Sequence, residues 1–487
     1  MDNENVLKKT IQRCQERDII IPTYEQMKHP VELVPTKIQQ ELKDIGLWDL
    51  HPRNLFRLTW KNNVETGGFG DVNYVEIPRE LTGVKPRIFA LVGKFFPTGS
   101  HKVGATFGPL VSRLLTGQFD PTGQKAVWPS TGNYCRGGAY DSALLACDSL
   151  AILPEEMSNE RFEWLKSIGA EIIATPGCES NVKEIFDKCW ELKAERGDEI
   201  VVLNQFSEFG NPIWHYEVTG SAIEEVLGDV MGSKDRFAAL PLTTGSAGTI
   251  GSGNYLRKVF PRMRVVAGEA WQCPTMLMNG FGGHRIEGIG DKHVPWIHDI
   301  RNTDAIGAVD DEYPMRLIRL FNEPAGREYL KKQGISVDFL EKLDLLGISS
   351  VGNMLLSIMT AKYFEMDEHD VIFTIFTDSM EMYQSRLQEM NNAQGDYNSV
   401  QAAVDFNVCL KNLQPEHYAE LTHWDRKRVH NLKYYTWIEQ QDKKLEELNS
   451  QWFDREYWER EMGQAAMWDQ EIKAFNQRVG LLKKYTD

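Results

Sequence analysis

The sequence predicts an α/β fold built on parallel sheets that helices cover on both faces. Short apolar runs rich in β-branched residues alternate with helix-length amphipathic stretches. Strands that are apolar at consecutive positions are typical of a parallel sheet buried on both faces. Loops rich in small residues follow several of these runs, as expected where a strand leads into a helix. The expected strands cover residues 88–92, 150–153, 171–174, 200–203, 237–240, 264–267 and 371–374.

We expect helical extensions on both sides of this core. Residues 1–60 are rich in charge, are punctuated by prolines and carry no recognisable chemical motif. They are expected to pack against the main body or against a second subunit. Residues 396–487 follow a break at Gln394-Gly395-Asp396 and form charged helical stretches with spaced tryptophans. Such a pattern is more typical of helices packing on one another than of ligand binding. The catalytic core is therefore expected at 61–395.

The composition excludes several classes of function. Lys and Arg number 54 against 70 Asp and Glu, a net charge of −16, which repels nucleic acid. The seven cysteines are scattered without Cys-x-x-Cys pairs or metal-ligand spacing, so neither disulfides nor a metal site is expected. No apolar run is long enough to cross a bilayer, and the first residues lack the features of a secretory signal. We expect a cytoplasmic protein without membrane contact.

A lysine follows a Gly-Ser turn at the start of a predicted helix. The stretch reads Phe95-Phe96-Pro97-Thr98-Gly99-Ser100-His101-Lys102, and small and apolar residues surround Lys102. An ordinary lysine is solvated at the surface, so this setting favours a buried amine with a chemical role. His101 is expected to be a packed or exposed histidine rather than a proton carrier, because the sequence offers it no partner.

A second loop reads Gly245-Ser246-Ala247-Gly248-Thr249 and stands between an apolar strand and a helix. We call residues 245–249 the Gly245 loop. Small residues let backbone N–H groups turn inward, and the N-terminus of a helix favours a phosphate. The loop lacks the G-x-G-x-x-G spacing of dinucleotide binding, and the chain has no Gly-Lys-Ser/Thr of a P-loop.

Two further small-residue loops and a polar stretch complete the pattern. They are Ser130-Thr131-Gly132-Asn133-Tyr134, Gln205-Phe206-Ser207 and Gly347-Ile348-Ser349-Ser350. With the lysine and the Gly245 loop, in this order, they resemble the fold-type II pyridoxal-phosphate enzymes. The resemblance is to the branch that holds O-acetylserine sulfhydrylase (cysteine synthase) and cystathionine β-synthase. It extends from Asn63 to Leu387.

This resemblance implies a two-lobed, tryptophan synthase β-like fold with a mobile lobe at about 125–220 and pyridoxal 5'-phosphate as cofactor. Lys102 would form the Schiff base, and Asn133 would contact the ring oxygen of the cofactor. Ser349 would face the pyridine nitrogen as a neutral hydroxyl, which weakens the electron sink and steers the chemistry toward β-elimination. The phosphate would be held by Gly245, Ser246, Ala247, Gly248 and Thr249. The substrate carboxylate would be bound by Ser130, Thr131, Gly132, Tyr134 and Gln205.

The chain departs from the family pattern at three positions. Gly104 stands where the family has an arginine, Tyr134 where a threonine is usual and His293 where an aromatic residue is usual. The first departure raises the question of how the helix after Lys102 is packed. The second implies a differently shaped pocket over the amino acid. Such drift is also what a non-catalytic homologue that binds the cofactor or a partner protein would display.

The resemblance implies β-elimination or β-replacement on a serine or cysteine derivative, through an aminoacrylate intermediate. Lys102 would be the catalytic base, a small amino acid the substrate and a homodimer the assembly. The alternative within enzymes is dehydratase-type deamination of serine or threonine, which uses the same lysine and phosphate loop. Formation of 2-oxobutanoate from threonine would favour that alternative, and sulfide-dependent cysteine formation would favour a synthase.

Overall fold

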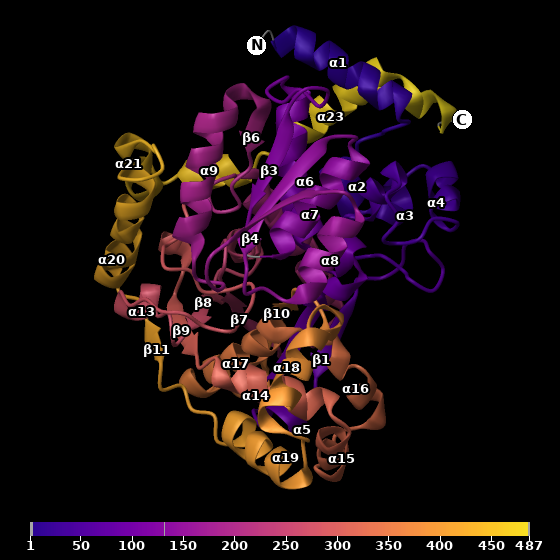
Figure 1. The fold of residues 1–487 in the computed structure, drawn as a ribbon. Coiled ribbons are helices and arrows are strands. Elements are labelled where there is room, and N and C mark those ends of the chain that lie inside the picture. The colour runs from indigo at the N-terminus through magenta and orange to yellow at the C-terminus, as the bar shows by residue number, and fades with distance from the viewer. Residues whose placement is uncertain (1–2, 131, 486–487) are drawn as a thin grey trace.

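The computed structural model describes residues 3–130 and 132–485, in which two sheets form separate layers (Figure 1). The larger has seven strands in the order β1-β2-β10-β7-β8-β9-β11, and the smaller has four in the order β5-β4-β3-β6. The strands are β1 (Tyr74–Ile77), β2 (Arg87–Val92), β3 (Lys125–Pro129), β4 (Asp148–Pro154), β5 (Glu171–Thr175), β6 (Ile200–Val202), β7 (Arg236–Thr243), β8 (Arg264–Ala270), β9 (Ala305–Val309), β10 (Asp370–Phe376) and β11 (Tyr418–Glu420).

The central strands of both sheets are parallel, which confirms the predicted α/β class. In the large sheet β2, β10, β7, β8 and β9 run parallel, while the edge strands β1 and β11 pair antiparallel with β2 and β9. The small sheet is parallel throughout. All seven expected strands form. The short edge strands β1 and β11 and the inner strands β3 and β9 were not predicted.

The unpredicted strand β9 lacks the usual strand composition because a helix and the neighbouring strand β11 pack closely against it. A Cβ at Gly307 in this strand would lie 2.5 Å from Leu356 and 2.9 Å from Tyr418. Leu356 belongs to α17 (Ile348–Tyr363), which packs across β7, β9 and β10 and is buried almost throughout. A strand made of small residues at this contact carries a weak β signal in the sequence.

Helices cover both faces of each sheet. In the small sheet α9 (Val182–Arg196) packs on one face, and α7 (Asn133–Leu144) with α8 (Asn159–Ser167) lies on the other. The large sheet carries α17 and α14 (Glu312–Asn322) on one face and α11 (Gly220–Val230) with α12 (Ile250–Val259) on the other. The helix α6 (Lys102–Leu115) joins the two sheets. The other core helices are α5 (Arg79–Thr82), α10 (Gly210–Trp214), α13 (Thr275–Met278), α15 (Pro324–Lys332), α16 (Val337–Glu341) and α18 (Gln384–Gln394).

The two ends of the chain meet on the outside of the core (Figure 1). The helix α1 (Asn3–Glu16) lies beside α23 (Ala465–Val479), and the Asn476 side chain exchanges hydrogen bonds of 3.2 and 2.7 Å with the backbone of Ile21. Asp469 accepts from the backbone N–H of Tyr24 at 2.6 Å. The other helices of the extensions are α2 (Tyr24–Lys28), α3 (Pro30–Leu33), α4 (Thr36–Leu42), α19 (Ser399–Phe406), α20 (His423–Lys433), α21 (Leu445–Phe453) and α22 (Tyr457–Met462).

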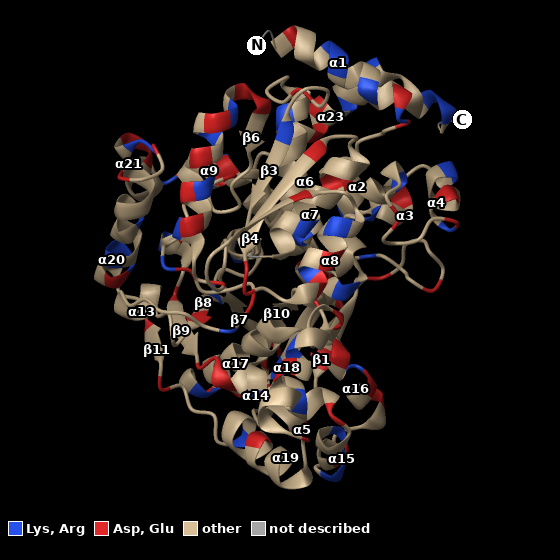
Figure 2. Ribbon diagram, in the orientation of Figure 1, with Lys and Arg blue, Asp and Glu red and all other residues tan. Residues whose placement is uncertain are grey.

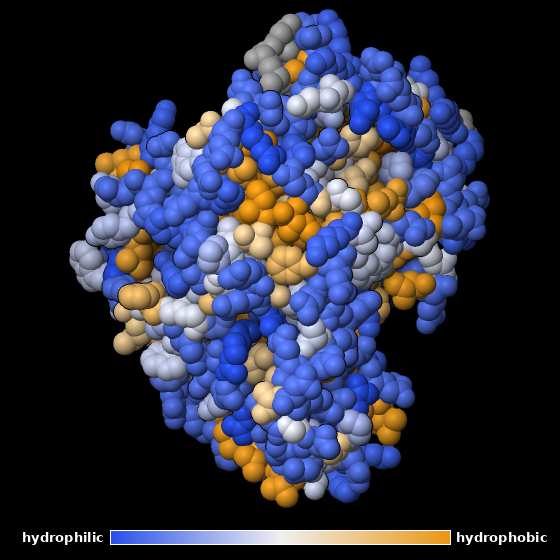
Figure 3. Space-filling view, in the orientation of Figure 1, coloured by the Kyte–Doolittle hydropathy of each residue, from blue (hydrophilic) through white to orange (hydrophobic). Residues whose placement is uncertain are grey.

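The surface in view is mostly hydrophilic (Figure 3), and charged residues gather on outer helices such as α9 and α23 rather than on the central strands (Figure 2). Among the described helices, none alone is both long and apolar enough to cross a bilayer. The pair Val337–Leu345 and Ile348–Tyr363, bent by 119°, passes that test of length and composition together, and its longer member is the buried helix α17.

Candidate active site

Lys102 stands at the first position of α6, directly after a tight turn that leads out of β2. Thr98 and Gly99 in that turn have φ of +65° and +69°, so the chain is held in a conformation that side chains disfavour. Lys102 is half-buried as a residue while its amine lies deep in the protein, and its Nζ donates to Ser246 Oγ at 3.4 Å. Burial lowers the pKa of Lys102 to about 8, although the carboxylates of Asp291, Glu179 and Asp378 oppose that shift.

The Gly245 loop connects β7 to α12 and receives the lysine. Ser246 Oγ accepts hydrogen bonds from Asn211 Nδ2 at 3.1 Å and from the Gly248 N–H at 3.3 Å, in addition to Lys102. Ala247 has φ of +61°, a strained value for a residue other than glycine. A Cβ at Gly248 would lie 2.1 Å from Asn211 Oδ1, so glycine is required there.

The same loop offers backbone donors for an anion. Within the described residues, the N–H groups of Gly245, Ser246, Ala247 and Thr249 have no hydrogen-bond acceptor. They stand at the N-terminus of α12, a helix of 10 residues, where the helix dipole favours negative charge. A phosphate at this position would satisfy donors that the protein leaves unpaired. This feature, beside a buried amine, fits pyridoxal phosphate.

The glycine that replaces the family arginine is explained by packing. A Cβ at Gly104 would lie 2.0 Å from Trp214, whose indole occupies the space beside α6. His101 is fully buried against Trp60 and His215, with ring centroids 5.6 and 5.0 Å apart. Burial holds the pKa of His101 well below its usual value. His101 is therefore a packed, neutral histidine.

The predicted carboxylate-binding residues Ser130 and Gln205 lie together. Gln205 Nε2 donates to Ser130 Oγ at 3.2 Å, and Ser130 Oγ also accepts from the Gly132 N–H at 3.2 Å. Gly132 has φ of +158°, and a Cβ there would lie 2.4 Å from Arg161 Nε, so no side chain fits at this position. Thr131, assigned to the same group, lies outside the described residues.

Asn133 belongs to a buried polar network that the sequence did not indicate. Its Nδ2 donates to Asp378 Oδ2 at 2.6 Å, and Tyr383 donates to the same oxygen at 2.7 Å. Arg161 Nη2 donates to the Tyr383 hydroxyl at 3.0 Å, while Nη1 pairs with the buried carboxylate of Glu287. Asn133 Oδ1 has no partner among the described residues, and the second N–H of its amide remains for a ligand.

Ser349 and Tyr134 have different surroundings. Ser349 is buried in the first turn of α17, and its Oγ lies 3.8 Å from the position of a Cβ on Gly288. The Tyr134 ring contacts that of Trp128 at 5.6 Å, and its hydroxyl is buried without a partner among the described residues. The charged groups that act on the pKa of Tyr134 are Glu208, Arg113 and Asp141, and none of them acts on the pKa of Lys102. The Tyr134 hydroxyl and the Lys102 amine therefore have different charged neighbours. The role of Tyr134 in binding the carboxylate stays a prediction.

Sequence reasoning assigned no role to the carboxylates that surround the lysine. Asp291 follows Gly290, whose N–H donates to Thr244 O at 2.8 Å beside the Gly245 loop. Burial raises the pKa of Asp291 well above its usual value, and the nearby Glu179 adds to that shift. The runs that contain Asp291 and Asp378 resemble family sequences, a signal that could have identified these two carboxylates. Nothing in the local sequence singles out Glu179.

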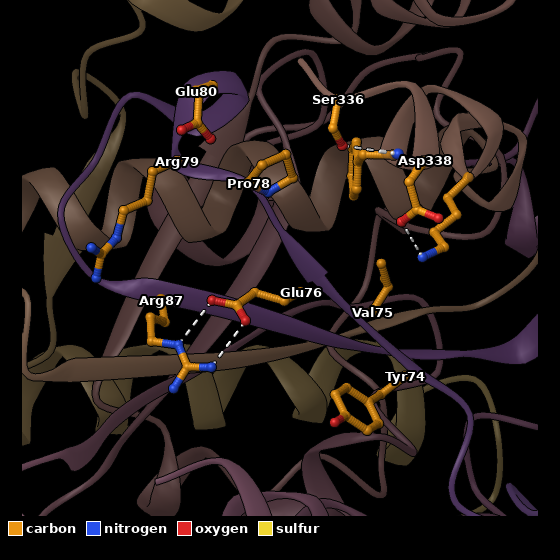
Figure 4. Close-up of a pocket in the computed structure, with 11 residues that line it drawn as sticks. Tyr74, Val75, Glu76, Pro78, Arg79, Glu80, Arg87, Ser336 and Asp338 are labelled. Atoms are coloured by element: carbon orange, nitrogen blue, oxygen red, sulfur yellow. Dashed lines mark hydrogen bonds and ion pairs between the residues drawn. The ribbon is translucent and has the colours of Figure 1, made fainter. Parts of the chain in front are cut away.

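A large surface hollow lies elsewhere. It has a volume of about 620 Å³ and lies between the edge strand β1 and the start of α16, and it contains none of the predicted site residues (Figure 4). Four of its charged groups are paired with one another, Arg87 with Glu76 at 2.8 Å and Lys342 with Asp338 at 2.8 Å. We therefore do not assign the active site to this hollow.

Comparisons with known proteins agree with the geometry at Lys102. Residues 66–326 match the family model described as "Pyridoxal-phosphate dependent enzyme". A cysteine synthase of Staphylococcus aureus is 30% identical over 291 residues, which cover 59% of this chain and 84% of that enzyme. Cystathionine beta-synthase of Saccharomyces cerevisiae is 28% identical over 320 residues, covering 63% of this chain and 59% of that enzyme. The chain thus spans less than two thirds of this second relative.

Solved structures share the fold at low sequence identity. O-acetyl serine sulfhydrylase isoform 3 of Entamoeba histolytica superposes with a TM-score of 0.55 at 22% identity, covering 69% of this chain and 92% of that one. A hydrogen sulfide-producing enzyme of Fusobacterium nucleatum gives a TM-score of 0.53 at 23% identity, covering 64% and 95%. Both matches support the two-sheet architecture.

Proposed function

Because this chain belongs to the family of pyridoxal-phosphate-dependent enzymes, we propose that it catalyses β-elimination or β-replacement on a serine or cysteine derivative. One observation carries the proposal: the buried amine of Lys102 contacts Ser246 in a loop with unpaired backbone donors at the N-terminus of α12. When bound, pyridoxal phosphate withdraws electrons from the α-carbon of an amino acid and so acidifies its α-proton. The relatives named cysteine synthase and cystathionine beta-synthase support this reaction class.

Four groups of side chains and backbone are proposed to hold the cofactor. Lys102 supplies the amine for covalent attachment, and the Gly245 loop binds the phosphate through its N–H groups. Asn133 binds the ring oxygen with the amide hydrogen that Asp378 does not use. Ser349 faces the ring nitrogen from the start of α17. Because a serine hydroxyl is neutral, it does not keep that nitrogen protonated as a carboxylate would.

Lys102 Nζ is also proposed to move the α-proton of the substrate. A pKa of about 8 leaves part of the amine neutral near neutral pH, and only the neutral form accepts a proton. The carboxyl groups of Asp291 and Asp378 lie close to the amine, and when they are ionised they favour its protonated form and so stabilise the ammonium that results. Burial excludes water that would otherwise compete for this proton.

The substrate carboxylate is proposed to bind at Ser130, Thr131, Gly132, Tyr134 and Gln205. Support comes from the contact of Gln205 with Ser130 and from the bare backbone at Gly132. Among the described residues, the side chains of Gln205 and Ser130 form hydrogen bonds only with each other and with the loop backbone. A carboxylate would replace that contact with two charge-assisted hydrogen bonds.

The test is covalent trapping followed by product analysis. Purified protein is incubated with pyridoxal phosphate, reduced with borohydride and digested, and the modified lysine is identified by mass spectrometry. We expect the label on Lys102. Label on other lysines alone, or none, would overturn the proposal and favour a non-catalytic homologue. Sulfide-dependent cysteine formation, or pyruvate from serine derivatives, supports the proposed reaction, whereas 2-oxobutanoate from threonine as main product supports a dehydratase.

We further infer a division into 1–60, 61–395 and 396–487, with the mobile lobe at 125–220. The support is that the small sheet falls within residues 125–202. A small amino-acid substrate, a homodimer and a cytoplasmic location are inferred from the resemblance. All seven cysteines lie in the described part of the chain and are unpaired, which fits a reducing compartment.

A further inference from the structure

One loop beside the large sheet contacts two of the predicted site segments and carries a carboxyl group that acts on the third, Lys102. We call residues 284–298 the Gly288 loop; they form neither helix nor strand. Within it the Gly290 N–H donates to Thr244 O at 2.8 Å, and Gly288 O lies 2.6 Å from the position of a Cβ on Gly245. Farther along, the Ile297 N–H donates to Phe206 O at 3.2 Å, next to Gln205. Asp291 of this loop is also the largest electrostatic influence on the Lys102 amine.

A loop without regular structure needs partners outside itself for its backbone carbonyls. Here the partners come from residues 423–458, which we call the C-terminal arm; it contains α20, α21 and the first two residues of the short helix α22. Figure 1 shows α20 and α21 on the flank of the core, next to α13. Arg428 donates to the backbone of Met276 in α13 at 2.9 Å, so the arm is held against the body of the protein.

Lys433 at the end of α20 is the first connection between the arm and the loop. Its side chain is fully buried, and Nζ donates to Trp296 O at 2.9 Å, to His298 O at 2.7 Å and to Gln451 Oε1 at 2.7 Å. All three donors of an ammonium group are used by these contacts. Gln451 in turn donates to Trp296 O at 3.2 Å. A buried lysine that binds two loop carbonyls fixes the backbone on either side of Ile297.

Trp437, one turn after Lys433, is the second connection. Its indole Nε1 donates to Val294 O at 2.8 Å, so three carbonyls of the Gly288 loop, at residues 294, 296 and 298, are bound by the arm. The Trp437 ring also contacts the rings of His293 and of Phe186 in α9, with centroid distances of 5.7 and 5.9 Å. Burial lowers the pKa of His293 to about 3, so this histidine fills an aromatic cluster in its neutral form.

We propose that Lys433 and Trp437 are positioning residues of the active site. By binding the Gly288 loop they hold Asp291 near Lys102 and keep the Gly245 loop in place. The catalytic consequence rests on the proposed function. The positioning itself does not, because it concerns only backbone contacts between the arm and residues 294–298. This gives the C-terminal arm a role in the reaction although its residues do not touch Lys102.

The test measures backbone hydrogen exchange and cofactor affinity in the full-length protein with pyridoxal phosphate added. Lys433→Met keeps an unbranched apolar side chain one atom shorter than that of lysine and removes the three hydrogen bonds. We expect amide exchange in residues 288–298 to become about tenfold faster and the cofactor dissociation constant to rise about tenfold. Exchange in α1 and α23 should not change. Lys433→Arg, which can still donate to both carbonyls, should recover most of the affinity.

Matched controls lie on the same arm. Lys444→Met changes an exposed lysine, and Trp424→Ala removes an indole whose residue is 76% exposed; both should behave as wild type. If Lys433→Met does not fold, Trp437→Phe deletes the bond to Val294 and should give the same pattern with a smaller change. The proposal would be overturned if amide exchange became faster only in the C-terminal arm, while exchange in the Gly288 loop and the affinity for pyridoxal phosphate stayed unchanged. If wild type itself fails to bind pyridoxal phosphate, the proposed function fails while the exchange result still decides the positioning.

Discussion

Gly104 and Trp214 occupy complementary positions on two neighbouring helices, with the indole placed where any side chain at residue 104 would begin. A Cβ at Gly104 would meet three atoms of the indole at 2.0 to 2.5 Å. Trp214 is fully buried and contacts Phe96 and His215 as well, so it has no room to withdraw. The helix that carries Lys102 is therefore fixed in place by a tryptophan.

We predict that Gly104→Ala destabilises the protein by about 1–3 kcal/mol, because an added methyl overpacks this contact. Urea unfolding measures the change. Gly228→Ala is the matched control, since Gly228 is an exposed glycine within a helix and a Cβ there would meet nothing within 4 Å. That variant should gain about 0.5–1 kcal/mol from helix propensity. Equal effects of both substitutions would contradict the packing argument.

The pKa of Lys102 predicts a pH dependence in cofactor-free protein. The folded pKa is about 8 and the value in the unfolded chain is 10.5. Between these values the unfolded chain carries the proton and the folded protein does not. The free energy of unfolding of wild type should therefore rise with pH across this interval, relative to that of Lys102→Met. Below pH 8 the difference between the two should be constant.

Chemical modification gives an independent measurement of the same amine. In cofactor-free protein, reductive alkylation of Lys102 should reach half its maximal rate near pH 8, as followed by peptide mass spectrometry. Lys332 provides an exposed reference lysine in the same digest. A midpoint near 10.5 for Lys102 would refute the buried setting on which its role as base depends.

Arg161 joins carboxylates from different parts of the chain, and its removal should be costly. The guanidinium is 1% exposed and pairs with Glu287, and it lies 3.9 Å from Asp378. Arg161→Met would remove the buried cation from between Glu287 and Asp378 and leave Glu287 with Arg386 alone, so we predict a loss of about 3–5 kcal/mol in the free energy of unfolding. In contrast, Lys183→Met breaks an exposed pair with Asp187 and should cost at most about 0.5 kcal/mol. A loss at Arg161 no larger than at Lys183 would show that the buried pair is dispensable.

The sequence predicted the parts of the site that local patterns determine. Lys102 and the Gly245 loop each stand at a junction that turn residues and an apolar strand identify, and they converge because the carboxyl ends of parallel strands meet at one edge. Ser349 was also expected after a strand, but it lies in the first turn of α17, which follows a 3-10 helix. Which carboxylates surround the amine could not be predicted in the same way. Asn133 and Asp378 are 245 residues apart, and their contact depends on how the two sheets pack.

The terminal extensions illustrate the same limit. Spaced tryptophans predicted helix packing, and Trp437 is indeed buried, whereas Trp424 is 76% exposed. Both residues stand in charged surroundings, so composition alone does not distinguish them. The difference is that the indole of Trp437 donates a hydrogen bond to the carbonyl of Val294. Val294 lies in the Gly288 loop, which has no repeating pattern that a sequence could reveal. Contacts with irregular backbone leave no signal in a single sequence.

Gln205 tests the assignment of the substrate carboxylate. Gln205→Leu keeps the volume of a buried side chain but removes the amide that donates to Ser130 at 3.2 Å. Because the amide is proposed to bind the substrate and not the cofactor, we expect the KM for the amino acid to rise at least about tenfold, the loss of one charge-assisted hydrogen bond. Affinity for pyridoxal phosphate should change less than about twofold. Steady-state kinetics and cofactor titration of the same preparation separate the two quantities. An unchanged KM together with weakened cofactor binding would move Gln205 from the substrate to the cofactor and require a new assignment of the carboxylate site.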